Sequence, residues 1–137
     1  MIATIEERIE SATKETESVT PLIEMGSDAY LDIVLYFKEK LESFTSNLSM
    51  LNENIIASFN QQPQEIYDLL PKIRILHLSS LQAIKKLKQS PYSKGLDATI
   101  SNMTIEVKQL REVIDDVKTI HVSIKKDDYL QSLFSQI

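Results

Sequence analysis

The sequence predicts an all-α fold, an elongated antiparallel bundle of three long helices with shorter helical segments at both ends. Only two of the 137 residues are glycine and four are proline, so few positions force a sharp turn. Apolar residues recur at alternating spacings of three and four, the pattern of a helix with one buried face. A chain of this length fits one domain, so residues 1–137 are interpreted as a single bundle.

The first helix is predicted over residues 2–19, and Pro21 and Gly26 indicate its end. The side chain of Ser27 or Asp28 is then expected to cap the second helix by accepting hydrogen bonds from its free N–H groups. The residues of the first helix that share the buried register are Ile2, Ile5, Ile9, Ala12, Thr16 and Val19.

The second helix has the longest heptad pattern and breaks at residues 60–64, which read NQQPQ. Its buried positions are predicted to be Tyr30, Val34, Phe37, Leu41, Phe44, Leu48, Leu51, Ile55 and Phe59. The third helix is predicted over residues 64–89. Pro71 should kink or restart it, because proline has no N–H to donate inside a helix.

The fourth helix begins near Leu96, after a turn at residues 90–95. Its register contains Leu96, Ile100, Met103, Val107, Leu110, Ile114, Val117, His121 and Ile124. Because the connections are short, consecutive helices are expected to be antiparallel neighbours. The first helix is too short to cover the whole bundle, and the C-terminal residues are expected to cover the rest.

The apolar face reverses in residues 127–137. If the fourth helix continued, four apolar side chains would point away from the core: Leu130, Leu133, Phe134 and Ile137. One interpretation, favoured because compact proteins rarely expose large apolar patches, is a break near residues 126–128 and a short helix that folds back beside the first helix. The other is a straight helix that docks a protein partner through these four residues.

Charge is distributed unevenly. Residues 1–70 hold four basic and thirteen acidic side chains, residues 71–96 hold six basic and none acidic, and residues 97–137 hold five and seven. The simplest interpretation is complementarity inside the bundle, between a basic third helix and the acidic first and second helices. Each such exposed ion pair contributes only about 0–1 kcal/mol.

The alternative interpretation is a partner-binding surface on the third helix. On a helical wheel Lys72, Ser79 and Lys86 lie at the back, whereas one flank of the buried face combines three cations with two leucines. This flank consists of Arg74, Leu78, Leu81, Lys85 and Lys88. It suits an acidic amphipathic helix of a protein partner. Nucleic acid is disfavoured, since the rest of the chain is acidic and no aromatic side chains alternate with the lysines.

His77 stands in the middle of the third helix and invites comparison with histidine phosphotransfer domains, which are acidic four-helix bundles with a phosphorylatable mid-helix histidine. Those domains typically carry lysine three residues and glycine four residues after the histidine, where this chain has Ser80 and Leu81. A leucine one turn away would crowd an approaching response regulator. Phosphotransfer through His77 is therefore a disfavoured alternative function.

His121 lies in the buried register of the fourth helix, and Lys118 and Lys125 beside it offer no second metal ligand. We expect a buried structural histidine. Because His77 and His121 both lie on or beside buried faces, stability should fall on acidification, since burying a charged imidazole is unfavourable.

The composition excludes several kinds of catalytic site. Without cysteine there is no thiol nucleophile or thiolate metal site, and two glycines cannot build a phosphate-binding loop or a nucleophile elbow. Adjacent acids such as Asp115 and Asp116 point about 100° apart on a helix and do not form a proton-sharing pair. We expect no enzymatic activity, cofactor or metal.

The first ten residues, MIATIEERIE, resemble neither a signal peptide nor a transit peptide, and no apolar run is long enough to cross a membrane. The sequence thus predicts a soluble intracellular protein, cytoplasmic or nuclear. Its predicted function is a non-enzymatic protein–protein interaction module, an adaptor, scaffold or subunit of a larger helical assembly. A homo-oligomeric coiled-coil protein is the alternative.

Overall fold

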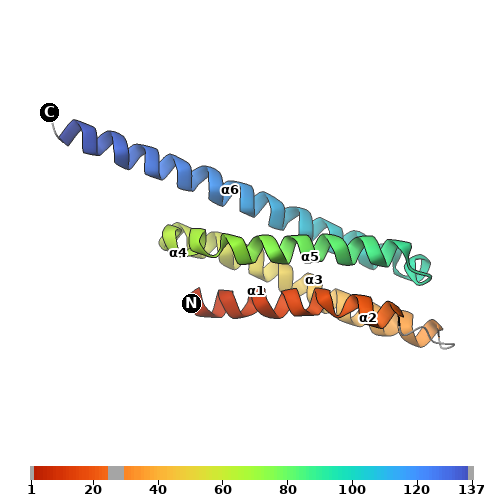
Figure 1. Cartoon of the computed structure of the whole chain (residues 1–137). Coiled ribbons are helices and arrows are strands. Elements are labelled where there is room, and N and C mark those ends of the chain that lie inside the picture. The colour runs from red at the N-terminus through yellow and green to blue at the C-terminus, as the bar shows by residue number, and fades with distance from the viewer. Residues whose placement is uncertain (1, 25–29, 136–137) are drawn as a thin grey trace.

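A computed structural model of the chain describes residues 2–24 and 30–135, with side chains described except at residues 24, 30, 122–128, 132 and 134–135. The described residues form helices and no strand, which confirms the predicted all-α bundle (Figure 1). The elements are α1 (Ile2–Glu17), α2 (Val19–Glu24), α3 (Tyr30–Gln61), α4 (Pro63–Asp68), α5 (Leu70–Gln89), the 3₁₀ helix η1 (Ser93–Leu96) and α6 (Asp97–Ser135). Ser27 and Asp28, the predicted caps of α3, lie outside the described residues.

The core is formed by the helix faces that the apolar spacing predicts. On α3 every predicted position from Val34 to Phe59 is buried, and on α6 the buried positions run from Ile100 to His121. On α1 the predicted residues from Ile5 to Thr16 are buried, while Ile2 is half-buried against the core. Repeated spacings of three and four place these side chains on one side of each helix, so that they pack into a single apolar cluster.

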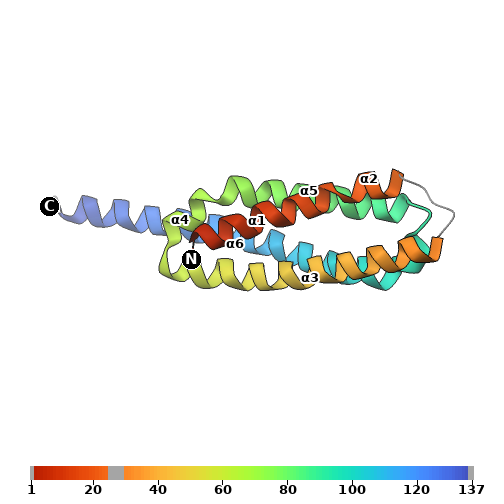
Figure 2. The same cartoon turned by 90° about the horizontal axis from the view of Figure 1, so that it is seen from below.

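Consecutive long helices run in opposite directions, as predicted, but α5 lies beside α1, which has the same direction (Figures 1 and 2). Near the starts of both helices the Lys72 ammonium donates to the carboxylates of Glu6 and Glu10. Further along, near the start of α2 and the end of α5, the Lys86 ammonium donates to the Thr20 hydroxyl, 2.7 Å away. Because the two contacts come in the same order along both segments, the pair is parallel.

The helices α3 and α6 are the second parallel pair of neighbours. The side-chain amide of Asn52 donates to the Glu106 carbonyl oxygen at 3.2 Å, and further along Gln64 of α4 contacts His121. Between α3 and α5, α4 carries the chain across the end of the bundle, so that α5 packs mainly against α1 and α6 (Figure 2). The expectation that consecutive helices are neighbours is therefore wrong for α3 and α5, because α4 separates them.

The prolines at 71 and 21 both stand in the first turn of a helix. Pro71 restarts the chain as predicted: α4 ends at Asp68 and α5 begins at Leu70. Pro21 does not end the first helical segment. The helix is interrupted at Ser18, whose N–H donates to the Lys14 carbonyl oxygen. The next helix, α2, runs to Glu24 with Pro21 at its third position. Proline is tolerated there because first-turn N–H groups have no partner within the helix.

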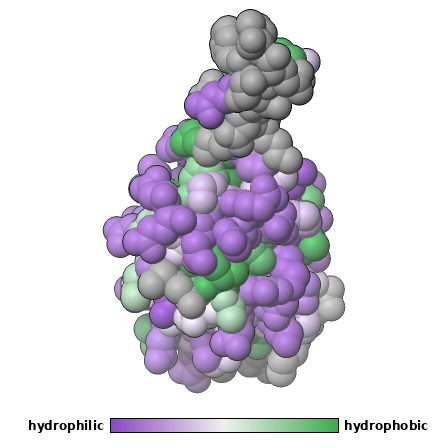
Figure 3. Space-filling view, turned by 90° about the vertical axis from the view of Figure 1, so that its left-hand side faces the viewer, coloured by the Kyte–Doolittle hydropathy of each residue, from purple (hydrophilic) through white to green (hydrophobic). Residues whose placement is uncertain are grey.

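The C-terminal residues continue α6 without a break to Ser135, and the helix projects beyond the end of the bundle (Figures 1 and 2). The fold-back interpretation is therefore wrong, as is the expectation that these residues cover the end of the first helix. No glycine or proline follows Gly95, so nothing in the backbone chemistry interrupts the helix. Seen from this end, the surface is mostly hydrophilic with apolar side chains confined to small areas, which leaves little for a folded-back helix to pack on (Figure 3).

Candidate partner-binding surfaces

The α5 flank is the predicted set Arg74, Leu78, Leu81, Lys85 and Lys88, and the structure brings all five together on the outer side of α5. Successive members are three or four residues apart, so they form one row along the helix. All five are exposed, with Leu78 at 58% and Leu81 at 43% of full exposure. Two adjacent leucines between cations are unusual on a face that contacts only water.

On the opposite side of α5, part of the positive charge of residues 71–96 is paired with acidic residues of α1. There Lys72 pairs with Glu6 and Glu10 of α1, and these hydrogen bonds raise the pKa of Lys72. The bond from Lys72 likewise holds the pKa of Glu10 below its ordinary value. The predicted complementarity with the acidic first helix thus exists, but it uses the cations at the back of α5. Arg74, Lys85 and Lys88 form no ion pair with any described residue.

His77 lies between the core and the α5 flank and is half-buried. Its pKa is lowered, first by burial and second by the Arg111 guanidinium of α6, while the Asp115 carboxylate acts in the opposite direction. The predicted obstruction is present, because Leu81 is exposed one turn further along α5. The side of α6 that carries Arg111 and Asp115 therefore lies toward His77 and the adjoining α5 flank.

His121 is buried where α4 packs on α6. Its ring stacks on Tyr67 with the centroids 3.5 Å apart and the planes 6° from parallel, and Nε2 lies 3.2 Å from Oε1 of Gln64. The sequence indicated the burial but not these partners, which α4 brings to the site. Among the residues that the structure describes, no three potential metal-binding side chains of His, Cys, Asp or Glu gather at one place.

The tail, defined as residues 122–135 of α6, contains the second predicted surface. Leu130 and Leu133 are each 41% exposed, and Tyr129, which the prediction did not include, is 64% exposed. The side chain of Phe134, and the whole of Ile137, lie outside the described residues. At 1.5 Å per residue the tail is roughly 20 Å long.

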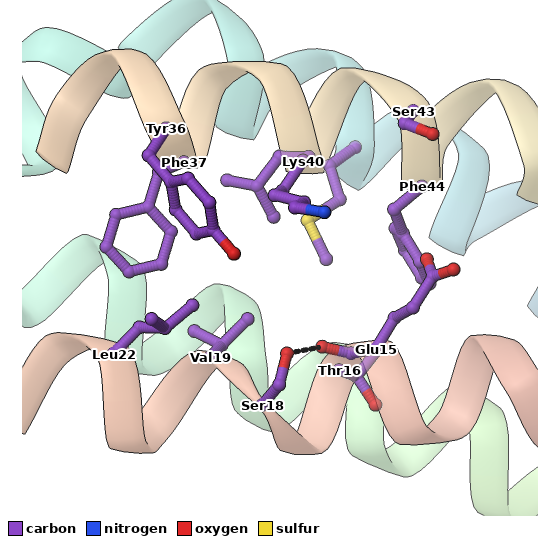
Figure 4. A pocket seen from close by; sticks show the side chains of 12 residues that line it. Glu15, Thr16, Ser18, Val19, Leu22, Tyr36, Phe37, Lys40, Ser43 and Phe44 are labelled. Carbon is purple, nitrogen blue, oxygen red and sulfur yellow. Dashed lines mark hydrogen bonds between the residues drawn. The ribbon is translucent and has the colours of Figure 1, made fainter. Parts of the chain in front are cut away.

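A cleft of about 220 Å³ between α1, α2 and α3 was not predicted, because its lining comes from separate helices that no local pattern relates. Figure 4 shows Leu22 and Val19 pointing toward Phe37 at one end of the cleft, with Phe44 beside Glu15 at the other end and Lys40 between them. Burial raises the pKa of Glu15, while Lys40 opposes this shift. The Lys40 ammonium also lies 5.6 Å from the Tyr36 ring centre. The lining is mixed: apolar side chains predominate, and the Ser18 hydroxyl donates to the Glu15 carbonyl oxygen at 2.7 Å.

Comparison with protein-family models, with curated proteins and with solved structures finds no match to this chain. None of the helices in residues 2–24 and 30–135 has the combination of length and apolarity that crossing a bilayer requires. The α5 flank and the tail are therefore considered candidate partner-binding surfaces because of their own exposure, spacing and charge.

Proposed function

We propose that the protein is a non-catalytic protein–protein interaction module, an adaptor or a subunit of a larger helical assembly, that binds its partner through helix surfaces. The observation that carries this proposal is the tail, a continuation of α6 beyond the bundle with Tyr129, Leu130 and Leu133 exposed. The α5 flank adds a second exposed row of apolar and charged side chains.

The energetics of an isolated helix support a role in binding. Isolated helices shorter than about 12–15 residues are only marginally stable in water, so a helical segment that projects beyond its bundle is stabilised by whatever packs on it. A partner helix packed on the leucines would remove apolar surface from water, at about 25 cal/mol per Å², and would stabilise the tail at the same time. Binding and ordering of the tail are thus coupled.

The tail suits a second copy of this chain as well as a different protein, and the mass of the purified protein separates these cases. For a module that binds another protein, we expect a monomer by sedimentation at concentrations of about 10–100 μM. A dimer that Leu133→Asp dissociates would favour the homo-oligomeric coiled-coil alternative. Phosphotransfer receives less support, because His77 is half-buried and Leu81 protrudes beside it.

The proposal is tested by affinity capture from the native cell with the wild-type chain and with the double variant Leu130→Asp, Leu133→Asp. Carboxylates on the apolar face should abolish capture of a specific partner, because they cannot be buried against an apolar helix. The control is Gln131→Asp, which places the same charge in the same turn but projects about 100° away from Leu130 and about 160° away from Leu133. Circular dichroism should show equal helix content in all three proteins. Equal capture by the double variant and the wild type would refute a binding role for the tail.

A further inference from the structure

The tail and the part of α6 beside α5 are in register. Tyr129 follows Arg111 by 18 positions, and Leu133 follows Asp115 by 18, a separation of about five full turns at 3.6 residues per turn. Because α6 is continuous from Asp97 to Ser135, Tyr129 and Leu133 project from the same side of the helix as Arg111 and Asp115. The apolar face of the tail therefore continues a face of the bundle.

That face of α6 borders the α5 flank. The helix α5 packs directly against α6. On α5, His77 lies between the buried face and the α5 flank, one turn from Leu81 and one turn from Arg74. Arg111 and Asp115 of α6 are near enough to His77 to act on it electrostatically. The α5 flank, this side of α6 and the tail thus follow one another without an intervening helix. They form a single row, here named the stripe.

The stripe is basic although the chain carries a net charge of −5. The α5 flank contributes three cations without ion pairs to described residues, and α6 adds Lys108, Arg111 and Lys118. These α6 residues project within about 80° of one another at 100° per residue. The opposing charges on this side are Asp115, Asp97 at the start of α6 and, at the outer edge, Glu112. Leucines lie among the cations on α5, and Leu130 and Leu133 are exposed on the tail.

We propose that the stripe is one docking site for a single acidic amphipathic helix of a partner protein, which lies along α5 and α6 and continues onto the tail. This inference rests on the proposed function. The apolar positions of the partner helix would contact Leu78, Leu81 and Leu133, while its carboxylates would face the cations of both helices.

The geometry sets the length of the partner helix. Leu81 is one turn from His77 toward the end of α5, and α5 and α6 are antiparallel, which places it roughly level with residue 109 of α6. From there to Tyr129 the distance is roughly 30 Å, or about 20 residues of a straight helix. One helix of ordinary length can therefore reach from Leu81 on α5 to Tyr129 on the tail.

An acidic helix fits the stripe better than nucleic acid or a second copy. A phosphate backbone would pair with the cations but would leave the leucines without apolar partners. In a second copy, the basic stripe would have to meet either another basic stripe or the acidic side formed by α1 and α3. Contacts between two different surfaces of identical chains tend to continue into open chains rather than close as a dimer.

Photo-crosslinking tests the inference. Because the chain has no cysteine, Leu81→Cys and Tyr129→Cys each provide a unique site for a benzophenone maleimide. Each labelled protein is irradiated in an extract of the native cell, and the adducts are identified by mass spectrometry. Leu35→Cys and Ile105→Cys are controls, since both side chains are exposed and apolar but lie off the stripe. We expect the 81 and 129 probes to label one protein, at residues about 20 positions apart in an acid-rich helix.

Charge reversal provides a second readout on that same partner. The triple variant Arg74→Glu, Lys85→Glu, Lys88→Glu should weaken its binding roughly tenfold or more at low salt, with a smaller difference at high salt. A matched change on α3, Lys38→Glu, should leave binding unchanged. Unaltered binding of the triple variant would overturn the inference.

The crosslinking outcomes separate the inference from the proposed function. Different proteins at the two positions, an adduct at only one of them, a second copy of the chain, or nucleic acid would each overturn the single acidic helix. A specific protein adduct at one position alone would still support an interaction module. No protein adduct at either position would count against both.

Discussion

The two halves of α6 have the same secondary structure and opposite surroundings. From Asp97 to His121 the helix packs against α3, α4 and α5, and Leu110 is 0% exposed, whereas in the tail Leu133 is 41% exposed. The backbone hydrogen bonds of a helix are made within the segment, so they continue whether or not another helix covers it. Burial depends on what the neighbouring helices offer, and the tail extends beyond them (Figure 1).

The largest difference is expected between two leucine substitutions on this one helix. Leu110→Ala should lower the free energy of unfolding by about 2–5 kcal/mol, because it leaves a cavity in a packed core. Leu133→Ala should change it by less than about 0.5 kcal/mol. Urea denaturation of both variants measures the two values. If Leu133→Ala destabilised the protein as much as Leu110→Ala, the tail would be part of the core and the comparison would fail.

The boundary between the two halves is expected to lie at His121. Replacing it with Ala removes the stack on Tyr67 and the contact with Gln64, so the free energy of unfolding should fall by about 1–2 kcal/mol. His77→Ala is the control, and it should have a smaller effect because that ring is half-buried and stacks on no described ring. Thermal unfolding ranks the two, and the opposite ranking would contradict this account of the boundary.

A smaller effect is expected from acidification, and it should involve the bundle rather than the tail. Burial lowers the pKa of His77 below its ordinary value of 6.5, so the unfolded chain takes up a proton at a higher pH than the folded chain. This contribution to stability is complete above about pH 6.5 and is lost as the pH falls through 6.5 toward the folded-state pKa. The melting temperature should drop slightly between pH 7.5 and 5.5.

The drop should be reduced in His77→Gln, which cannot take up the proton. The drop in melting temperature should persist in Leu133→Asp, since Leu133 lies about five turns along α6 from Asp115, which acts on His77. A melting temperature that is constant between pH 7.5 and 5.5 would contradict the assignment, as would an equal drop in His77→Gln.

The sequence was sufficient for the parts of the fold that depend on local spacing. Positions such as Phe37 and Leu110 follow from the spacing of apolar residues, and the restart at Pro71 follows from the missing N–H. It was also sufficient to place the α5 flank, because the helical wheel separates Arg74 and Lys85 from Lys72. These features require only the geometry of one helix.

The remaining features depend on relations between segments. The position of α5 beside α1 depends on how α4 crosses the end of the bundle, and the stack of His121 on Tyr67 depends on the same crossing. The reversed apolar face of the tail suggested a break. A change in the apolar face does not by itself interrupt the helical backbone, and no neighbouring helix is near enough for the tail to fold onto. The register between Tyr129 and Arg111 was visible in the sequence, but it became informative only once α6 proved continuous.

Amide hydrogen exchange is the most direct test of the claim that partner binding covers the tail. In the free protein, residues 126–135 should exchange much faster than residues 107–121, because the tail projects beyond the bundle and its described apolar side chains, Tyr129, Leu130 and Leu133, are exposed. With the partner identified by crosslinking bound, exchange should slow in the tail and along residues 74–88 together. Strong protection of the tail in the free protein, or unchanged exchange in both segments upon binding, would contradict the account.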